Sequence, residues 1–241
     1  KILIDSLGSK KQNLPLLYDF ELMQGGGRIC GWLVAGDDAK AFDDALLRYA
    51  EAMACKYGKN PVLYAVGDGN HSLASAKGCY LENTGCANAR YALVELENIH
   101  DAAQVFEPIH RIVLKTDTEK LLRDLRAVCA PGGFAVQCRV GSRTETVTLD
   151  RSKGELAVAV LQNFLDAWLA VHPEAEIDYI HGDDALRRLS DREDALGLMP
   201  CGFAKADLFP YIRRWGVLPR KTFSMGHAQE KRYYLEARKI K

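Results

Sequence analysis

The sequence predicts an α/β or α+β protein in which a mixed β-sheet is flanked by helices. Apolar runs of strand length alternate along the chain with longer segments whose apolar residues recur at helical spacing. Two of the strand-like runs, 134–140 and 144–150, are separated by Gly141-Ser142 and predict a hairpin. Interleaved helices and strands together with a hairpin are typical of a mixed sheet.

The first half of the chain alternates between the two kinds of element. Gly25 to Gly27 predict a hairpin turn, and Gly58 predicts the end of a long helix for which Asp37 or Asp38 is a suitable N-cap. Strands, which are apolar throughout or alternate with polar residues, are expected at 28–34, 61–66 and 90–98. Helices, whose apolar or small residues recur at helical spacing, are expected at 36–58 and 71–82.

The second half begins with an expected strand at 106–114, in which Pro108 suggests a sheet edge or a bulge. Prolines also limit two helices, because one is expected to end at Pro131 and another to be interrupted at Pro210. The remaining strands are expected at 134–140, 144–150, 176–181 and 195–200, with two more in the tail from 221 to 240. The remaining helices are expected at 117–130, 156–172, 183–191 and 205–216.

The composition is that of an ordinary globular protein. The 241 residues are 48% hydrophobic, and 32 basic residues balance 32 acidic ones. Zero net charge argues against a dedicated nucleic-acid binder, which usually carries a basic surplus. No apolar run approaches the roughly 18 residues of a membrane span, and no signal peptide is visible. We therefore expect a cytoplasmic protein with no membrane partner.

The chain has seven cysteines, an odd number, and no two of them form a C-x-x-C pair, which argues against a zinc ribbon. Buried, reduced thiols are the simplest interpretation, with Cys55 and Cys79 in helices, and they agree with a cytoplasmic location. The run Pro131-Gly132-Gly133 is the best candidate for an internal boundary, dividing the chain into 1–130 and 131–241, with a single domain as the alternative. Because the first residue is Lys1, we expect an N-terminal part of the full protein to be missing.

The segment from Gly67 to Ser72, Gly-Asp-Gly-Asn-His-Ser, joins an expected strand to an expected helix that Asn70 or Ser72 could cap. Unpaired N–H groups at such a turn, together with the helix dipole, bind phosphate or carboxylate readily. Asp68 could hold a metal ion or accept a proton, and His71 could contact a phosphoryl group or transfer a proton. The alternative is a structural turn, in which Asp68 caps the backbone and His71 packs at a helix start.

Three other places could join this turn. The expected strand 106–114 places Glu107 and Arg111 on one face and His110 on the other, although a solvated strand with an ion pair is the alternative. The turn around residue 220 carries two cations and two hydroxyls that could bind an anion: Arg220, Lys221, Thr222 and Ser224. A solvated strand end explains the same residues equally well. Asp183 and Asp184 follow His181 at an expected helix start, and capping of that helix is their simplest role. The alternative is that they supply further ligands.

Four segments together resemble the domain of unknown function 1015 family, in its clostridial-type branch: residues 17–34, 64–78, 90–111 and 216–240. Family members are substantially longer at the N-terminus, so this chain resembles their C-terminal part. Many members carry D-G-H-H-R at the central motif, where this chain has Asp68, Gly69, Asn70, His71 and Ser72. The Asp-Gly-x-His core is kept, and Ser72 removes the basis for a guanidinium–phosphate contact at this turn.

The D-G-H-H-R pattern is similar to the phosphate-contacting turn of the ParB and sulfiredoxin-like fold, in which some proteins phosphorylate free serine. The resemblance implies a kinase that uses ATP or ADP as phosphate donor and the hydroxyl of a free amino acid, serine above all, as acceptor. Asp68 would hold Mg²⁺ or orient that hydroxyl, and His71 would act with it in catalysis. The remaining roles would be nucleotide and phosphate binding by Gly67, Gly69, Asn70, Ser72, His110 and Arg111, and substrate binding by Glu107, Arg220, Lys221 and Thr222.

Two other functions remain open. The first is a nucleotide-gated DNA-binding or regulatory module of ParB type, which the zero net charge disfavours. The second is metal-dependent phosphoester hydrolysis, with oxygen ligands from Asp68, Glu107, Asp183 and Asp184 if these meet in space. A kinase releases a phosphorylated amino acid, whereas a hydrolase transfers the phosphoryl group to water.

Overall fold

The computed structural model describes residues 3–67, 69–226 and 235–239. The chain divides into two compact units, one of Lys1–Asp101 with Arg232–Lys241 and the other of Ala102–Lys231. It contains a two-stranded sheet in the first unit and a six-stranded sheet in the second, each accompanied by helices. The predicted α+β class is therefore confirmed, and every described strand pairing is antiparallel.

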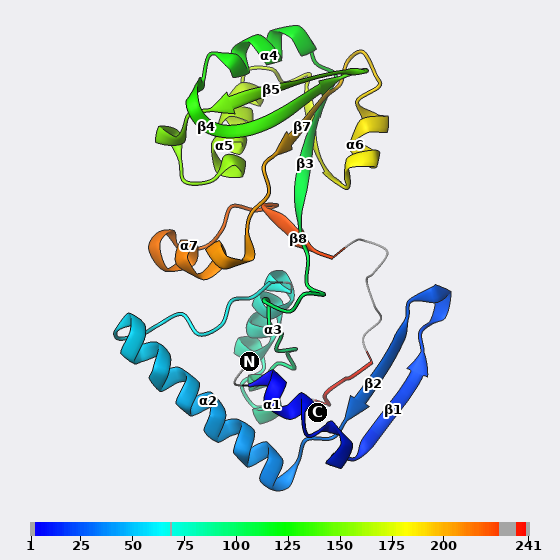
Figure 1. Cartoon of the computed structure of the whole chain (residues 1–241), viewed down its shortest axis with the longest axis vertical. Helices are drawn as coiled ribbons and strands as arrows, with labels where there is room; N and C mark the ends of the chain where they lie inside the picture. The colour runs from blue at the N-terminus through cyan, green and yellow to red at the C-terminus, as the bar shows by residue number, and fades with distance from the viewer. Residues whose placement is uncertain (1–2, 68, 227–234, 240–241) are drawn as a thin grey trace. The chain divides into compact units, whose positions relative to one another are not determined.

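The first unit has a β-hairpin and several helices (Figure 1). Its elements are α1 (Ile4–Gly8), β1 (Leu16–Glu21), β2 (Arg28–Trp32), α2 (Gly36–Tyr57) and α3 (Asn70–Glu82). The expected glycine turn is confirmed, because β1 and β2 pair across Gly25 to Gly27 and the N–H of Leu22 donates to the carbonyl of Gly27. Helix α2 ends where expected, at Gly58, but no side chain caps its start, so the expected cap by Asp37 or Asp38 is wrong.

The first unit buries few side chains among its described residues, and Ala45 is the one hydrophobic residue there that is fully buried. The strands expected at 61–66 and 90–98 are wrong, since neither segment pairs with another strand in the part of the chain that the structure describes. The expected burial of Cys55 and Cys79 is also wrong, although both lie in helices as predicted. An apolar run becomes a strand only when a partner satisfies its backbone, and no strand of the described residues pairs with these segments.

The second unit contains one antiparallel sheet in the order β5-β4-β7-β3-β6, with β8 pairing to the first residues of β3. Its strands are β3 (Phe106–Leu114), β4 (Cys129–Val140), β5 (Arg143–Leu149), β6 (Glu176–His181), β7 (Leu196–Pro200) and β8 (Phe223–Met225). Its helices are α4 (Thr118–Arg126), α5 (Ala157–Leu169), α6 (Asp183–Leu189) and α7 (Leu208–Trp215). No helix among the described residues is long and apolar enough to cross a membrane.

Two hydrophobic clusters lie on opposite faces of this sheet. Leucines of α4 and α5 pack with alternate strand residues, including Val113, in the larger cluster. Ile112, the neighbour of Val113 in β3, packs instead with Leu186 of α6 in the smaller cluster. In Figure 1, α5 and α6 accordingly lie on different sides of the sheet. Successive residues of β3 therefore contact different helices, and this alternation decides where each predicted site residue points.

Pro131 and Pro210 do not end or interrupt a helix as the sequence predicts. Pro131, Gly132 and Gly133 lie inside β4, within the second unit, where the pairing to Leu149 jumps from Cys129 to Phe134. A Cβ on Gly133 would lie 1.9 Å from the carbonyl oxygen of Leu149, so this residue must be glycine for the bulge to form. Pro210 does not interrupt a helix, because α7 begins at Leu208 and tolerates proline in its first turn.

Candidate functional site

The turn before α3 begins the helix without a side-chain cap. Gly69 is the N-cap residue and takes the left-handed backbone conformation with φ of 83°. Neither Asn70 nor Ser72 caps the helix, contrary to expectation, and both are exposed together with His71. Asp68, the predicted metal-holding residue, lies outside the described residues.

The first turn of α3 is suited to bind negatively charged oxygen. The first helical hydrogen bond runs from the N–H of Leu73 to the carbonyl of Gly69 at 2.8 Å, so the three preceding N–H groups have no acceptor within the helix. The dipole of a 13-residue helix adds partial positive charge at this end. The exposed His71 imidazole and Ser72 hydroxyl stand beside those N–H groups in the sequence and can add hydrogen bonds.

The structure separates His110 from Arg111. His110 faces α6, where its Nε2 lies 2.8 Å from Oδ1 of Asp183. Its ring is buried, at 3% exposure, and Nδ1 has no hydrogen-bond partner among the described residues. Arg111 faces α5 on the other side of the sheet, as the alternation of β3 predicts. One small anion bound at a single face would therefore contact only one of these two side chains.

Arg111 is fully buried beneath α5. Its Nε donates to Oε1 of Gln162 at 3.3 Å, and its Nη1 donates to the carbonyl of Ile109. Its Nη2 has no partner in the part of the chain that the structure describes. The guanidinium carbon lies 5.3 Å from the ring centroid of Tyr179. Desolvation lowers the pKa of Arg111 to about 10, and Tyr179 partly opposes this shift. At physiological pH the side chain remains a buried cation.

Polar residues line the end of the same sheet face. Nδ1 of His181 lies 3.3 Å from the Ser224 hydroxyl, and Ser224 is the register partner of Glu107. His181 is exposed, whereas Ser224 is half-buried. Both residues therefore lie near the start of β3, on the side that also carries Arg111.

The predicted cations Arg220 and Lys221 sit in a turn just before β8. Lys221 has a left-handed backbone with φ of 60°, and both side chains are exposed. Thr222 is buried and donates its hydroxyl hydrogen to the carbonyl of Pro219 at 2.5 Å. Thr222 therefore holds the turn closed, and the two cations point to solvent, where they can attract an anion.

The described residues do not form a resident metal site. No group of three or more His, Cys, Asp or Glu side chains in the described ranges is arranged to hold a metal ion. Asp183 and Asp184 each lie 3.9 Å from Arg187, in the first turn of α6.

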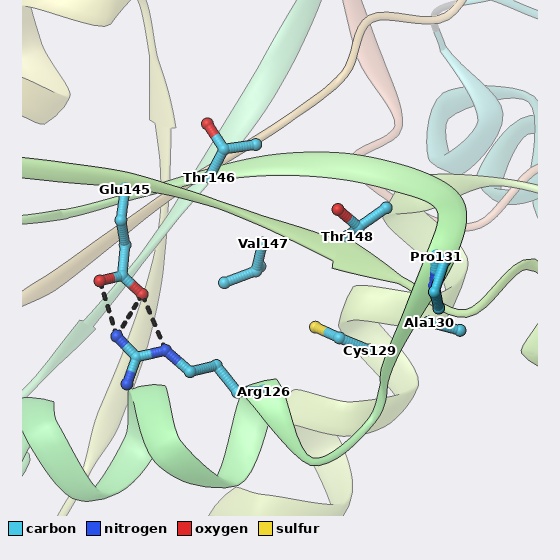
Figure 2. Close-up of a pocket in the computed structure, with 8 residues that line it drawn as sticks. All are labelled: Arg126, Cys129, Ala130, Pro131, Glu145, Thr146, Val147 and Thr148. Atoms are coloured by element: carbon cyan, nitrogen blue, oxygen red, sulfur yellow. Dashed lines mark hydrogen bonds and ion pairs between the residues drawn. The ribbon is translucent and has the colours of Figure 1, made fainter.

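A surface hollow of about 570 Å³ lies beside the β4 bulge (Figure 2). The Arg126 guanidinium closes one end with a bidentate pair to Glu145, in which Nη2 lies 2.6 Å from each carboxylate oxygen. The rest is lined by residues of β4 and β5: Cys129, Ala130, Pro131, Thr146, Val147 and Thr148. None of the predicted site residues borders this hollow.

A family model described as "Protein of unknown function (DUF1015)" matches residues 1–240. The chain belongs to this DUF1015 family. No curated protein matches it.

Solved structures of a free serine kinase resemble the DUF1015 chain. A mutant kinase in complex with AMP has a TM-score of 0.49 and 14% identity, covering 76% of this chain and 80% of that one. A further mutant in complex with ADP has a TM-score of 0.47 and 14% identity over the same shares. Likeness at this level carries no information on what the DUF1015 chain binds or does.

The predicted site residues of the DUF1015 chain belong to both units. The turn at 67–72 lies in the first unit, and the predicted residues of β3 and of the turn before β8 lie in the second. Sequence reasoning missed Tyr179 and Gln162, which contact Arg111. Gln162 offered a signal, because it and the adjacent Asn163 are amides in an otherwise mostly apolar helical run. Tyr179 offered none, since its proximity depends on the register between β3 and β6.

Proposed function

We propose that this chain is a nucleotide-dependent phosphotransferase that phosphorylates the hydroxyl of a free amino acid, with serine as the expected acceptor and ATP or ADP as the donor. The observation that carries the proposal is the exposed start of α3, where neither Asn70 nor Ser72 caps the helix and where the six residues from 67 to 72 contain an acid, an imidazole and a hydroxyl. Phosphoryl transfer needs mostly positioning and neutralisation of charge on phosphate oxygens. Backbone N–H groups at a helix start supply both.

Each residue has a proposed part. The N–H groups of the first turn of α3 hold phosphate oxygens, and His71 contacts the transferred phosphoryl group. Asp68 orients the acceptor hydroxyl or contacts nucleotide-bound Mg²⁺. Arg220 and Lys221, which are exposed and adjacent, attract the acceptor carboxylate or a phosphate.

The test is to incubate the protein with Mg²⁺, free serine and either ATP or ADP, and to detect O-phosphoserine by mass. His71→Ala and Asp68→Asn should each lower turnover about a hundredfold or more, since both remove groups proposed to act on the reacting atoms. His100→Ala is the matched control, because His100 is an exposed histidine of the first unit that lies outside the turn. Full activity in both variants would show that the turn is not catalytic, and inorganic phosphate without phosphoserine would support the hydrolase instead.

A further inference from the structure

Two buried hydrogen-bond donors on the α5 side of the sheet lack acceptors. They are Nη2 of Arg111 and the hydroxyl of Tyr179, neither of which has a partner in the described part of the chain. The two residues are register partners in the antiparallel pair of β3 and β6. Register partners project from the same face of a sheet, with Cβ atoms about 5 Å apart. The two residues that carry these unsatisfied donors are thus cross-strand neighbours, with the guanidinium carbon 5.3 Å from the Tyr179 ring centroid.

Among the residues that the structure describes, Arg111 has no counter-charge. Arg111 forms no ion pair with any described residue, and its bonded partners are an amide oxygen and a carbonyl oxygen. The nearest carboxylate in this network, Asp166, accepts instead from Nε2 of Gln162 at 2.8 Å. That bond orients the Gln162 amide so that its oxygen faces Arg111. A fully buried cation without a negative partner is costly, which favours binding of an anion from outside the chain.

The guanidinium points along β3 toward the first residues of the strand. Because Nη1 donates to the carbonyl of Ile109, the Arg111 side chain folds back along β3 toward its start. His181 is the register partner of Ile109, and its exposed ring contacts Ser224. One pleat of about 7 Å separates Arg111 from Ile109, the register partner of the exposed His181. A small anion could therefore reach the guanidinium from that end.

We propose that Arg111 and Tyr179 form the floor of an oxyanion subsite on the α5 side of the sheet, with His181 and Ser224 at its mouth. The subsite takes a phosphate or carboxylate oxygen, which accepts hydrogen bonds from Nη2 of Arg111 and from the Tyr179 hydroxyl. A charge-assisted bond to a desolvated guanidinium is among the stronger hydrogen bonds in proteins. The identity of the ligand, a nucleotide phosphate or an amino-acid carboxylate, rests on the proposed function, whereas the subsite itself rests on the two unsatisfied donors.

The test follows the Nε–H signal of Arg111 by nuclear magnetic resonance while inorganic phosphate is added to the full chain. We expect a saturable shift in the wild-type protein and about tenfold weaker phosphate binding in Tyr179→Phe, which removes one hydrogen bond. Tyr211→Phe is the control, because Tyr211 lies in α7 of the same unit and is only partly buried. Binding measured by calorimetry should also be lost at this site in Arg111→Met.

Separate titrations with ADP, acetate and free serine identify the source of the oxyanion. A shift with phosphate and ADP assigns the subsite to the nucleotide, and a shift with acetate and serine assigns it to the acceptor. No shift with any of the four, or equal affinities in the wild type and Tyr179→Phe, would overturn the subsite and leave water as the partner of these donors. Binding without phosphoserine formation would sink the kinase proposal while the subsite stands. Phosphoserine formation without any anion-induced shift of the Arg111 signal would do the reverse.

Discussion

The hydrogen bond between His110 and Asp183 predicts a measurable loss of stability. In Asp183→Ala, both ring nitrogens of the buried His110 would lack a protein partner, because Nδ1 already has none. Leaving a buried polar group unsatisfied costs about 1–3 kcal/mol, and we expect about 1–2 kcal/mol here. The lower part of the range applies because the Asp183 side chain is 60% exposed, so water reaches the place that it leaves.

Asp184→Ala is the matched control for this loss. Both acids lie in the first turn of α6, and each carboxylate lies 3.9 Å from Arg187, so helix-dipole and ion-pair effects are the same. Those shared effects amount to about 0.5 kcal/mol or less at exposed positions. Urea unfolding at neutral pH measures both variants. Equal free energies of unfolding in Asp183→Ala and Asp184→Ala would refute the claim that His110 depends on this bond.

The core and the thiols of the second unit give further measurable consequences. Leu161→Ala removes a fully buried side chain of α5 and should cost about 3 kcal/mol by chemical denaturation, whereas Leu47→Ala, at a position 63% exposed, should cost less than about 0.5 kcal/mol. Iodoacetamide labelling near neutral pH, followed by mass spectrometry, should modify the exposed Cys201 well before Cys138, since burial raises the pKa of Cys138 to about 12. Between pH 9 and 12 only the unfolded Cys138 thiol ionises, so stability should fall more steeply with pH in the wild type than in Cys138→Ala, and equal slopes would contradict this.

Elements with strong local signals could be predicted from the sequence. The bounds 106–114 expected for β3 and 176–181 for β6 agree with the structure residue by residue. Both are β-rich runs flanked by polar turns, and the sheet buries them. The segment 61–66 has the same kind of sequence yet pairs with no described strand, because pairing depends on a partner that lies elsewhere in the chain.

In the candidate site too, local features could be predicted from the sequence and contacts between distant segments could not. The helix start after Gly69 could be predicted because glycine placement and small residues act locally. The placement of His110 and Arg111 on opposite faces also follows from the alternation of a strand. Their partners could not be predicted, since Asp183 and Tyr179 reach β3 only through sheet order and register.

The most direct test of the proposed activity is a phosphorus-31 magnetic resonance time course of the protein with Mg²⁺, free serine and either ATP or ADP. We predict a growing phosphomonoester signal of O-phosphoserine that matches the loss of the donor's terminal phosphate and nearly disappears in His71→Ala. A donor signal that stays constant, or a phosphate loss accounted for entirely by inorganic phosphate, would contradict the account.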